Sequence, residues 1–596
     1  MGQPVQVQVL STAIHLCQPR VLRGPNSRDG QNMSSDQPDN AVGFAFSTAD
    51  FCRQVAAELK VSNDQIEGAV RLLDDGNTIP FIARYRKEAT RGLDERQLRT
   101  IEDMLARARE LAARKNTILK TISEQGQLTD ALRSQIEQCS DSRILEDLYL
   151  PYRPKKRTRA AMARERGLQP LAEILLGQHR TTGSRKDIVK AFINPAKDVA
   201  DEDAAIRGAC DIVAEVWAET PGNRQWMIEQ VQRGEQVSMV KKGKSEEGRK
   251  FENYFDCRER VSKMPAHRFL AMQRGEAEGV LRLSLSIDDE ALQRHLKSRL
   301  ITNSDFEFRT ELEATVADCY KRLLRPAGES VLMQQLKEKA DAEAVQVFAR
   351  NMRDLLMAAP AGPQVTIGID PGFRTGCKVA VVDATGQFLT SETIYPTPPR
   401  EEKEKAAATL LRLIRDHNAT LISIGNGTAS RETDRFVSEM IRHNGLNVTK
   451  VVVNEAGASV YSASETAIEE YPDLDVTVRG AVSIAHRLQD PLSELVKIDP
   501  QSIGVGQYQH DVDQKLLKKA LDREVESCVN SVGVGANTAS PSLLSYVAGI
   551  GAVLAKRIVD FRNENGAFRS RSELLKVPRF GQKAYQQAAG FLRVRN

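Results

Sequence analysis

Residues 365–370 read Val-Thr-Ile-Gly-Ile-Asp, and residues 378–383 read Lys-Val-Ala-Val-Val-Asp. These apolar runs and residues 387–394 are separated by short turns, so they predict three consecutive strands of a β-meander. Helices and strands then alternate: helix at about 401–416, strand at 420–424, helix near 430–444, strand at 448–453 and helix from about 476 to 498. We therefore expect one α/β domain over residues 361–500.

The order of these elements favours one fold. Three antiparallel strands followed by alternating helix and strand is the ribonuclease-H-like order. The preceding segment, residues 359–363, reads Ala-Pro-Ala-Gly-Pro. Because proline and glycine interrupt regular structure, this segment marks the boundary in front of the domain.

The half before this domain predicts helices almost throughout, with little β structure. Apolar residues recur at helical spacing from Ser47 onward, and a long helical run covers residues 330–358. Proline lacks an N–H group and clashes with the preceding turn, so breaks are expected where prolines occur. These are Pro80, Pro151, Pro154, Pro195, Pro265 and Pro326. We expect a disordered tail over residues 1–45 and a helical region over residues 46–360.

The composition is that of a soluble multidomain protein. A chain of 596 residues suggests about four units, and 41% hydrophobic with 28% charged residues is typical of globular domains. No run approaches the roughly 20 apolar residues that span a bilayer. The eight cysteines form no CxxC pair and have no histidine-rich neighbourhood. We therefore expect reduced thiols, no metal site, no cofactor and a cytoplasmic location.

Acidic residues decide whether the α/β domain is a nuclease. Such nucleases need three or four carboxylates around two metal ions, which neutralise charge on the attacking and leaving oxygens. The candidates are Asp370, Glu455, Asp490 and Glu494, the last two expected on one helical face. The alternatives are a turn anchored by Asp370 and a solvated acidic helix face.

The second central strand argues against hydrolysis. It ends in Gly425-Asn426-Gly427, where a nuclease of this fold would be expected to carry a glutamate. We therefore interpret Asp370, Glu455 and Asp490 as vestigial and the protein as a non-enzyme.

The strongest nucleic-acid signal lies in residues 541–596. Gly549-Ile550-Gly551 followed by Lys556 is a helix-hairpin-helix pattern, and Gly581 followed by Lys583 echoes it. Glycines let the turn approach a phosphate, the next helix offers N–H groups, and the lysine adds charge. The segment holds 10 Lys or Arg against 3 Asp or Glu. We expect sequence-independent backbone contacts, the alternative being hairpins that serve only domain packing.

A second basic stretch is the other candidate contact. Seven cations lie between residues 153 and 166, against Glu165 alone. A solvated helix start is the alternative interpretation. The residues singled out as backbone contacts are Arg153, Lys155, Lys156, Arg157 and Arg159.

Long motifs in this sequence resemble the Tex family, in order and over nearly everything after residue 46. They are residues 77–88, 146–159, 367–376, 424–433, 454–464, 487–492 and 502–513. The resemblance implies a helical N-terminal region with a helix-turn-helix-like part, a YqgF-type ribonuclease-H-like domain, tandem helix-hairpin-helix motifs over residues 501–596, and a transcriptional role through nucleic-acid binding. It also implies a following oligonucleotide-binding β-barrel, and the sequence stops at Asn596 without one.

We therefore expect a multidomain, mainly α protein with one α/β domain, which binds RNA or DNA backbone without strong sequence preference and assists transcription. Two other classes stay open. One is a metal-dependent nuclease resembling Holliday-junction resolvases, and the other is a scaffold that contacts the transcription or translation machinery through its helical surface. No membrane partner is expected, and the oligomeric state is left open.

Overall fold

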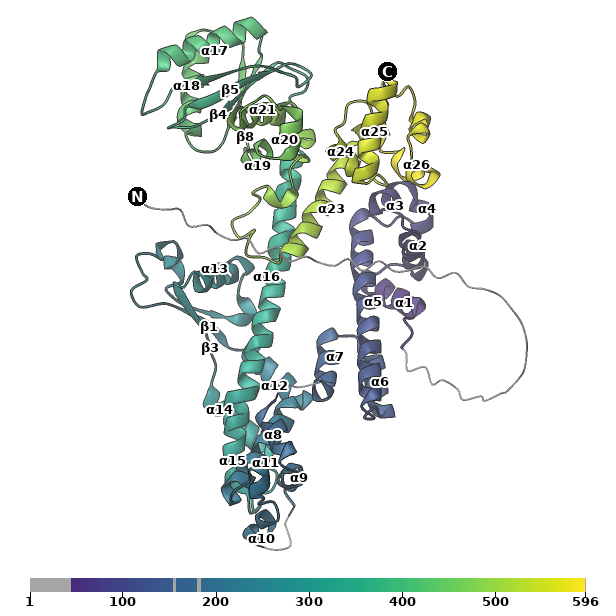
Figure 1. The fold of residues 1–596 in the computed structure, drawn as a ribbon, viewed down its shortest axis with the longest axis vertical. Coiled ribbons are helices and arrows are strands. Elements are labelled where there is room, and N and C mark those ends of the chain that lie inside the picture. Colours follow the sequence, from purple (N-terminus) through teal and green to yellow (C-terminus); the bar gives the residue numbers. More distant parts are fainter. Residues whose placement is uncertain (1–43, 154–156, 180–183, 595–596) are drawn as a thin grey trace, which may run out of the picture.

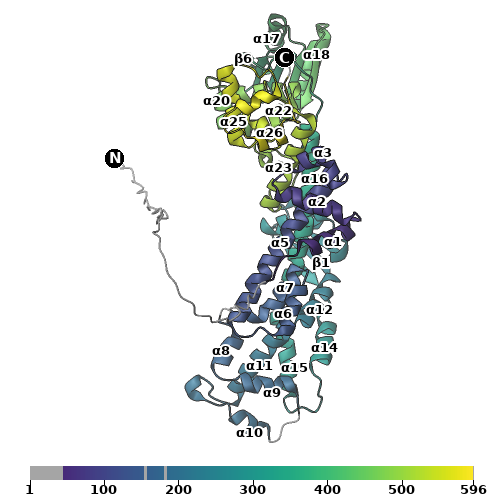
Figure 2. The same cartoon turned by 90° about the vertical axis from the view of Figure 1, so that its right-hand side faces the viewer.

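A single long helix organises the molecule. The computed structural model describes residues 44–153, 157–179 and 184–594. In Figure 1, helix α16 (Arg325–Leu356) runs along the elongated molecule, with the α/β domain at its upper end and a group of short helices at its lower end. Figure 2 shows the elongation again after a quarter turn. Among the described residues, no helix combines the length and apolar character that crossing a membrane requires.

The N-terminal module is all helical. Its helices are α1 (Thr48–Leu59), α2 (Asn63–Asp74), α3 (Ile79–Tyr85), α4 (Lys87–Thr90), α5 (Glu95–Glu124), α6 (Asp130–Gln138) and α7 (Ser142–Tyr149). Capping boxes start α2 at Ser62 and α5 at Asp94, where side chains accept hydrogen bonds from otherwise free backbone N–H groups. Pro80 stands in the first turn of α3, where no N–H is needed, so a new helix starts there as expected.

The central region supplies most of the lower half of Figure 1. Its elements are α8 (Arg159–Glu165), α9 (Gln169–Gly177), α10 (Arg185–Lys190), α11 (Glu202–Glu219), α12 (Pro221–Gln232), β1 (Glu235–Val240), β2 (Asp256–Arg260), α13 (Ala266–Ala277), β3 (Leu281–Ser286), α14 (Asp289–Leu300) and α15 (Arg309–Asp318). A π-helical segment, Cys319–Leu324, joins α15 directly to α16. Helix α15, the π-helical segment and α16 therefore form one continuous helix of 48 residues, from Arg309 to Leu356.

The expected break at Pro326 was wrong. Leu324 and Arg325 keep right-handed helical backbone angles, and α16 begins in continuity with the π-helical segment. A proline removes one backbone donor and crowds the carbonyl four residues earlier. The wider π turn directly before Pro326 relieves that conflict, so the helix continues through the proline.

The expectation of an almost purely helical first half was also incomplete. Strands β1, β2 and β3 form an antiparallel sheet in the order β2-β1-β3. One face packs on α13 and buries Gln236 and Ser238, while Arg258 and Arg282 of the other face are exposed. The strands have five or six residues each, and β2 (Asp-Cys-Arg-Glu-Arg) is polar, but β3 (Leu-Arg-Leu-Ser-Leu-Ser) alternates apolar and polar residues, a strand signal that was overlooked.

The α/β domain confirms the predicted order of elements. These are β4 (Thr366–Asp370), β5 (Cys377–Val382), β6 (Phe388–Ile394), α17 (Lys403–His417), β7 (Leu421–Gly425), α18 (Ser430–His443), β8 (Thr449–Val453), α19 (Ala458–Ser462), α20 (Glu465–Glu470) and α21 (Val476–Gln489). The sheet order is β6-β5-β4-β7-β8, with β4, β7 and β8 parallel. Helices α17 and α18 cover one face, and α21 packs on the other.

The C-terminal module carries the hairpins. Its elements are α22 (Pro491–Leu495), α23 (Gln514–Val532), β9 (Val534–Gly535), α24 (Pro541–Ser545), α25 (Ala552–Asn565), the 3₁₀ helix η7 (Arg571–Lys576), α26 (Gln582–Ala588) and β10 (Leu592–Arg593). Its core includes Phe348 and Met352 of α16 and Phe81 of α3. Both views place the hairpins beside the N-terminal module (Figures 1 and 2).

Candidate nucleic-acid interface

The first hairpin joins α24 to α25 through Gly549-Ile550-Gly551. Gly549 has a φ of 78°, and a Cβ there would lie 2.7 Å from the Cβ of Gln587 on α26. Gly551 has an ordinary φ of −91°, is exposed, and has nothing within 4 Å of the place of its Cβ. The two glycines therefore differ in role, because Gly549 permits the turn and its packing while Gly551 leaves a helix end open.

The N-terminus of α25 is uncapped by side chains. Gly551 is its N-cap residue and makes no side-chain capping hydrogen bond, which leaves the first backbone N–H groups directed outward. These groups and the helix dipole favour an anion. Lys556, on the second turn, is exposed and has no ion pair in the part of the chain that the structure describes.

A groove of about 930 Å³ opens beside this turn, and we call it the hairpin groove. The α24–α25 hairpin forms one wall, α23 forms a second, and Thr78 of the N-terminal module closes a corner. Its lining residues are Thr78, Lys515, Lys518, Lys519, Asp522, Arg523, Glu526, Ser545, Tyr546, Val547, Gly549, Ile550 and Gly551.

Sequence reasoning missed the charged wall of this groove, although the signal was present. The six charged lining residues lie at positions i, i+3, i+4, i+7, i+8 and i+11 of α23, from Lys515 to Glu526, which is one helical face. Four of them are cations and two are acids. Local charge density did not reveal this face, because the acids Asp522, Glu524 and Glu526 of the same helix offset most of its cations.

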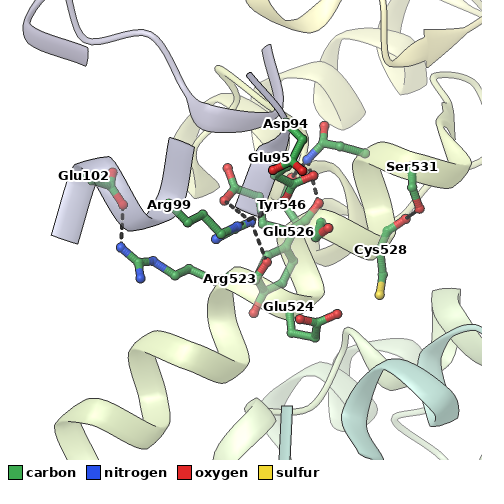
Figure 3. A network of polar contacts seen from close by, with 12 residues as sticks. Asp94, Glu95, Arg99, Glu102, Arg523, Glu524, Glu526, Cys528, Ser531 and Tyr546 are labelled. Carbon is green, nitrogen blue, oxygen red and sulfur yellow. Dashed lines mark hydrogen bonds and ion pairs between the residues drawn. The ribbon is translucent and has the colours of Figure 1, made fainter. Parts of the chain in front are cut away.

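Most charges of this face are already paired, chiefly with α5 of the N-terminal module. Arg523 binds Glu102 and Asp103, and Lys519 binds Asp103 at 2.8 Å. Figure 3 shows the neighbouring contacts, in which Arg99 of α5 lies between Glu95 and Glu526. Within the described ranges Lys515 has no such partner. The network therefore fixes α23 against α5 and leaves one lysine of the wall unpaired.

The second hairpin is turned toward protein. The Nζ atom of Lys583 donates a hydrogen bond to the main-chain oxygen of Asp75, and Gln587 of the same helix contacts Gly76 and Thr78. Gly581, the N-cap of α26, is exposed and open, but α26 has only seven residues. The structure thus gives Lys583 a partner in the N-terminal module.

The basic stretch near residue 153 lies apart from the hairpins. Arg153, Arg157 and Arg159 are exposed around the start of α8, whereas Lys155 and Lys156 lie outside the described residues. In both views α8 is in the lower half of the molecule and α25 in the upper half (Figures 1 and 2). These arginines and the first hairpin therefore do not form one site.

Two of the acidic candidates come together in the α/β domain. Burial, with a further contribution from Glu455, raises the pKa of Asp370 to about 6. The carboxylate of Glu455 lies where Cβ atoms on Gly425 and Gly427 would stand, at 2.2 and 1.6 Å from its oxygens. The glycine-rich turn is thus the space that Glu455 fills, so the turn has no room for another acidic side chain.

The other two acidic candidates do not join them. Helix α21 ends at Gln489 and Asp490 caps α22, so the expected single helix over 476–498 was wrong, as was the shared face of Asp490 and Glu494. Gly480 faces Asp370, and Asp490 follows ten residues later, about 15 Å along the helix. At that end Gln489 contacts Gln364, just before β4. Asp490 therefore lies beyond the opposite end of β4 from Asp370.

Glu494 is a structural residue. It is 2% exposed, accepts a hydrogen bond from Ser483 at 2.5 Å, and pairs with Lys497 at 2.9 Å. Burial opposes its ionisation, but Lys497 and His486 outweigh burial and lower the pKa of the carboxyl. Within the described residues, no group of three or more His, Cys, Asp or Glu side chains is placed to hold a metal ion.

Comparisons with known proteins match most of the chain, from residue 49 to residue 593. Family models match in succession: the Tex-like protein N-terminal domain at residues 49–123, the Tex central region at 181–348, the Tex protein YqgF-like domain at 364–489 and a helix-hairpin-helix motif at 529–593. The chain is 50% identical to protein YhgF of Escherichia coli (91% of this chain, 71% of the relative). It is 49% identical to transcriptional accessory protein Tex of Neisseria gonorrhoeae (91% and 72%) and 35% identical to human S1 RNA-binding domain-containing protein 1 (88% and 54%).

Proposed function

Because this chain belongs to the Tex family, we propose that it binds the phosphate backbone of RNA or DNA without strong sequence preference and acts as an accessory factor in transcription. The names of its relatives support both parts of this proposal, the binding of nucleic acid and the role in transcription. One relative is called a transcriptional accessory protein, and another is called an RNA-binding domain-containing protein. Its partners on this view are nucleic acid and the transcription machinery. The seven free cysteines in the described ranges fit a reducing compartment, and we place the protein in the cytoplasm.

The open N-terminus of α25 is the observation that carries the proposal. An exposed turn at Gly551, uncapped N–H groups and Lys556, which has no ion pair among the described residues, offer the donors and the charge that a phosphate needs. None of these groups reads a base edge, so contacts of this kind position the chain on a backbone without selecting a sequence. We assign the contact to Gly551 and Lys556 of the first hairpin.

We further propose that the α/β domain does not hydrolyse nucleic acid. An in-line displacement assisted by two metal ions needs carboxylates on several sides of the ions. Asp370 and Glu455 are close to each other, but glycines occupy the facing positions 425, 427 and 480. Two carboxylates with glycine opposite them are too few ligands for that chemistry.

The test is a fluorescence-anisotropy titration of labelled single-stranded RNA, single-stranded DNA and duplex DNA at two salt concentrations, with Mg²⁺ present. We expect salt-dependent binding and intact probes. Lys556→Glu should weaken binding to all three probes and lower the slope of log K against log salt by about 1. The matched control is Lys186→Glu, at an exposed lysine of α10 that has no ion pair within the residues that the structure describes.

Other outcomes favour the other classes. Probe cleavage that Asp370→Asn abolishes would establish a nuclease. If the probes are neither bound nor cleaved, the remaining class is a scaffold whose helical surface contacts other proteins. Equal effects of Lys556→Glu and Lys186→Glu would mean that charge alone, and not the hairpin, holds the nucleic acid.

A further inference from the structure

We propose that the hairpin groove holds a single-stranded segment of nucleic acid, with a phosphate at the N-terminus of α25 and Lys515, and a base beside Tyr546. This inference rests on the proposed function and makes it specific, since backbone contact by the hairpin alone does not distinguish single strands from duplexes.

The size of the groove fits a single strand. A B-form duplex, whose major groove alone is roughly 12 Å wide, is too bulky to enter a groove of about 930 Å³ and would lie over it. The volume falls within the roughly 300–1,000 Å³ of sites that take small ligands, so it accommodates a short stretch of nucleotides.

Tyr546 supplies an aromatic surface in this wall. It is partly buried against the C-terminal core and lines the groove. Burial, with Asp522 and Asp499 nearby, raises its pKa to about 12, so its ring is neutral under ordinary conditions. Stacking of bases on aromatic rings is the common mode of single-strand binding, and it is tolerant of sequence because every base has a flat face.

Thr78 adds a polar group with no partner of its own. Its hydroxyl oxygen is buried without a hydrogen bond in the described part of the chain, although its backbone N–H contacts Gln587. Thr78 therefore positions a corner of the groove through its backbone hydrogen bond to Gln587 of α26. The N-terminal module thus contributes one residue to the lining of the groove.

The charge of the groove favours an anion. The lining holds four cations and two acids, of which Asp522 lies 3.5 Å from Lys518 and Glu526 shares Arg99 with Glu95. Lys515 is exposed and unpaired within the described ranges, and the dipole of α25 adds partial positive charge at Gly551. An acidic peptide shares this attraction, but the combination of an aromatic ring with a phosphate-binding helix end fits a nucleotide chain better.

Photo-crosslinking of the full chain tests the placement directly. The probe is a uridine-rich RNA strand of about 12 nucleotides that carries 5-iodouridine, irradiated in the complex and mapped by mass spectrometry of the digested protein. We expect the crosslinked residue to be Tyr546 or a neighbour within the groove lining. Crosslinks found only outside the groove would overturn the inference.

Affinities of variants give the second measurement. Tyr546→Ala should weaken single-strand binding by roughly tenfold, as expected for one stacked base, while Tyr546→Phe keeps the ring and should bind as the wild type does. Lys515→Glu should weaken single strands more than duplexes, with Lys186→Glu as the control. If Tyr546→Ala does not fold, the position of the crosslink and the affinity of Lys515→Glu for single strands still test whether the groove binds them.

The outcomes separate the two proposals. If the wild type binds duplex as tightly as single strand and Tyr546→Ala has no effect, while Lys556→Glu still weakens binding, the groove inference fails and the proposed function stands. If no nucleic acid binds but an acidic peptide does, both fail and the groove is a protein-docking site.

Discussion

The side-chain ammonium of Lys583 donates a 2.7 Å hydrogen bond to the main-chain carbonyl of Asp75, which lies 508 residues earlier in the chain. Asp75 is the C-cap of α2, where free carbonyl groups and the negative end of the helix dipole attract a cation. Around it, Arg84 donates to the carbonyl of Asn530 and the ring of Tyr85 packs edge-on against Phe591. The second hairpin thus holds the N-terminal and C-terminal modules together.

Lys583→Glu should loosen this docking. It removes the hydrogen bond and places a carboxylate at a helix C-terminus, at a cost of about 1–2 kcal/mol. Hydrogen exchange should speed up at the end of α2 and in α26. Lys186→Glu, at an exposed lysine of α10 that has no ion pair among the described residues, is the control. Exchange rates equal to those of the control would contradict the docking role.

The two glycines of the first turn should respond in opposite ways. Gly549→Ala forces a side chain into a left-handed backbone and against Gln587, so it should destabilise the C-terminal module by about 1–3 kcal/mol. Gly551→Ala meets no neighbouring atom and should leave the melting temperature nearly unchanged. Its methyl group should nevertheless lower nucleic-acid affinity by obstructing the approach of a phosphate. Equal stability of the two variants would refute this assignment.

The contact between α5 and α23 should weaken in acid. Burial opposes ionisation of Asp103, but hydrogen bonds from Arg523 and Lys519 outweigh it and hold the pKa at about 2, below the usual 3.8. A lowered carboxyl pKa stabilises the folded state above about pH 4, and this contribution is lost as the pH falls toward 2. Asp103→Asn should therefore destabilise the protein at pH 6 and have little effect near pH 2.

Thermal melting at several pH values measures this effect. Asp130→Asn, at an exposed aspartate of α6 that has no ion pair in the described chain, is the control. An Asp103→Asn melting curve that parallels the wild type at every pH would show that the pair contributes nothing.

Asp370→Asn should stabilise the α/β domain at alkaline pH. Burial and the neighbouring Glu455 raise the pKa of Asp370 from 3.8 to about 6, so the folded domain binds the proton more tightly than the unfolded chain does. Ionisation then costs stability as the pH rises from about 4 through 6, by up to about 3 kcal/mol at pH 8. The melting temperature of the variant should exceed that of the wild type at pH 8 and match it at pH 4.

Adding a divalent metal tests whether Asp370 and Glu455 bind an ion. Added Mg²⁺ or Mn²⁺ should leave the difference between Asp370→Asn and the wild type unchanged. A rise in the melting temperature of the wild type alone would show that Asp370 and Glu455 bind the ion, and it would contradict the proposal that they are vestigial.

The α/β domain was predictable because its pattern is local. The strands at 366–370 and 377–382 are continuous apolar runs, as buried strands require, and turns separate them. The turn at Gly549–Gly551 was predictable for a related reason, since a positive φ there calls for glycine. Both are features that a few adjacent residues determine.

What could not be predicted depends on residues far apart. The partner of Lys583 is a backbone carbonyl, which no side-chain pattern records. The end of α21 before Pro491 was missed because the apolar spacing continues into α22, although the residue before a proline disfavours helical angles. The charged face of α23 was visible as a helical stripe, but its place in the groove depends on docking.

The continuous helix over residues 309–356 makes the molecule a lever. At 1.5 Å per residue it is about 72 Å long, so a tilt of about 5° at one end displaces the other by about 6 Å. The π-helical segment at Cys319–Leu324 is the place where the hydrogen bonds of this helix depart from the regular pattern, and such segments often mark functional sites. A force on the central region would therefore displace the α/β domain, with the pivot near residue 320.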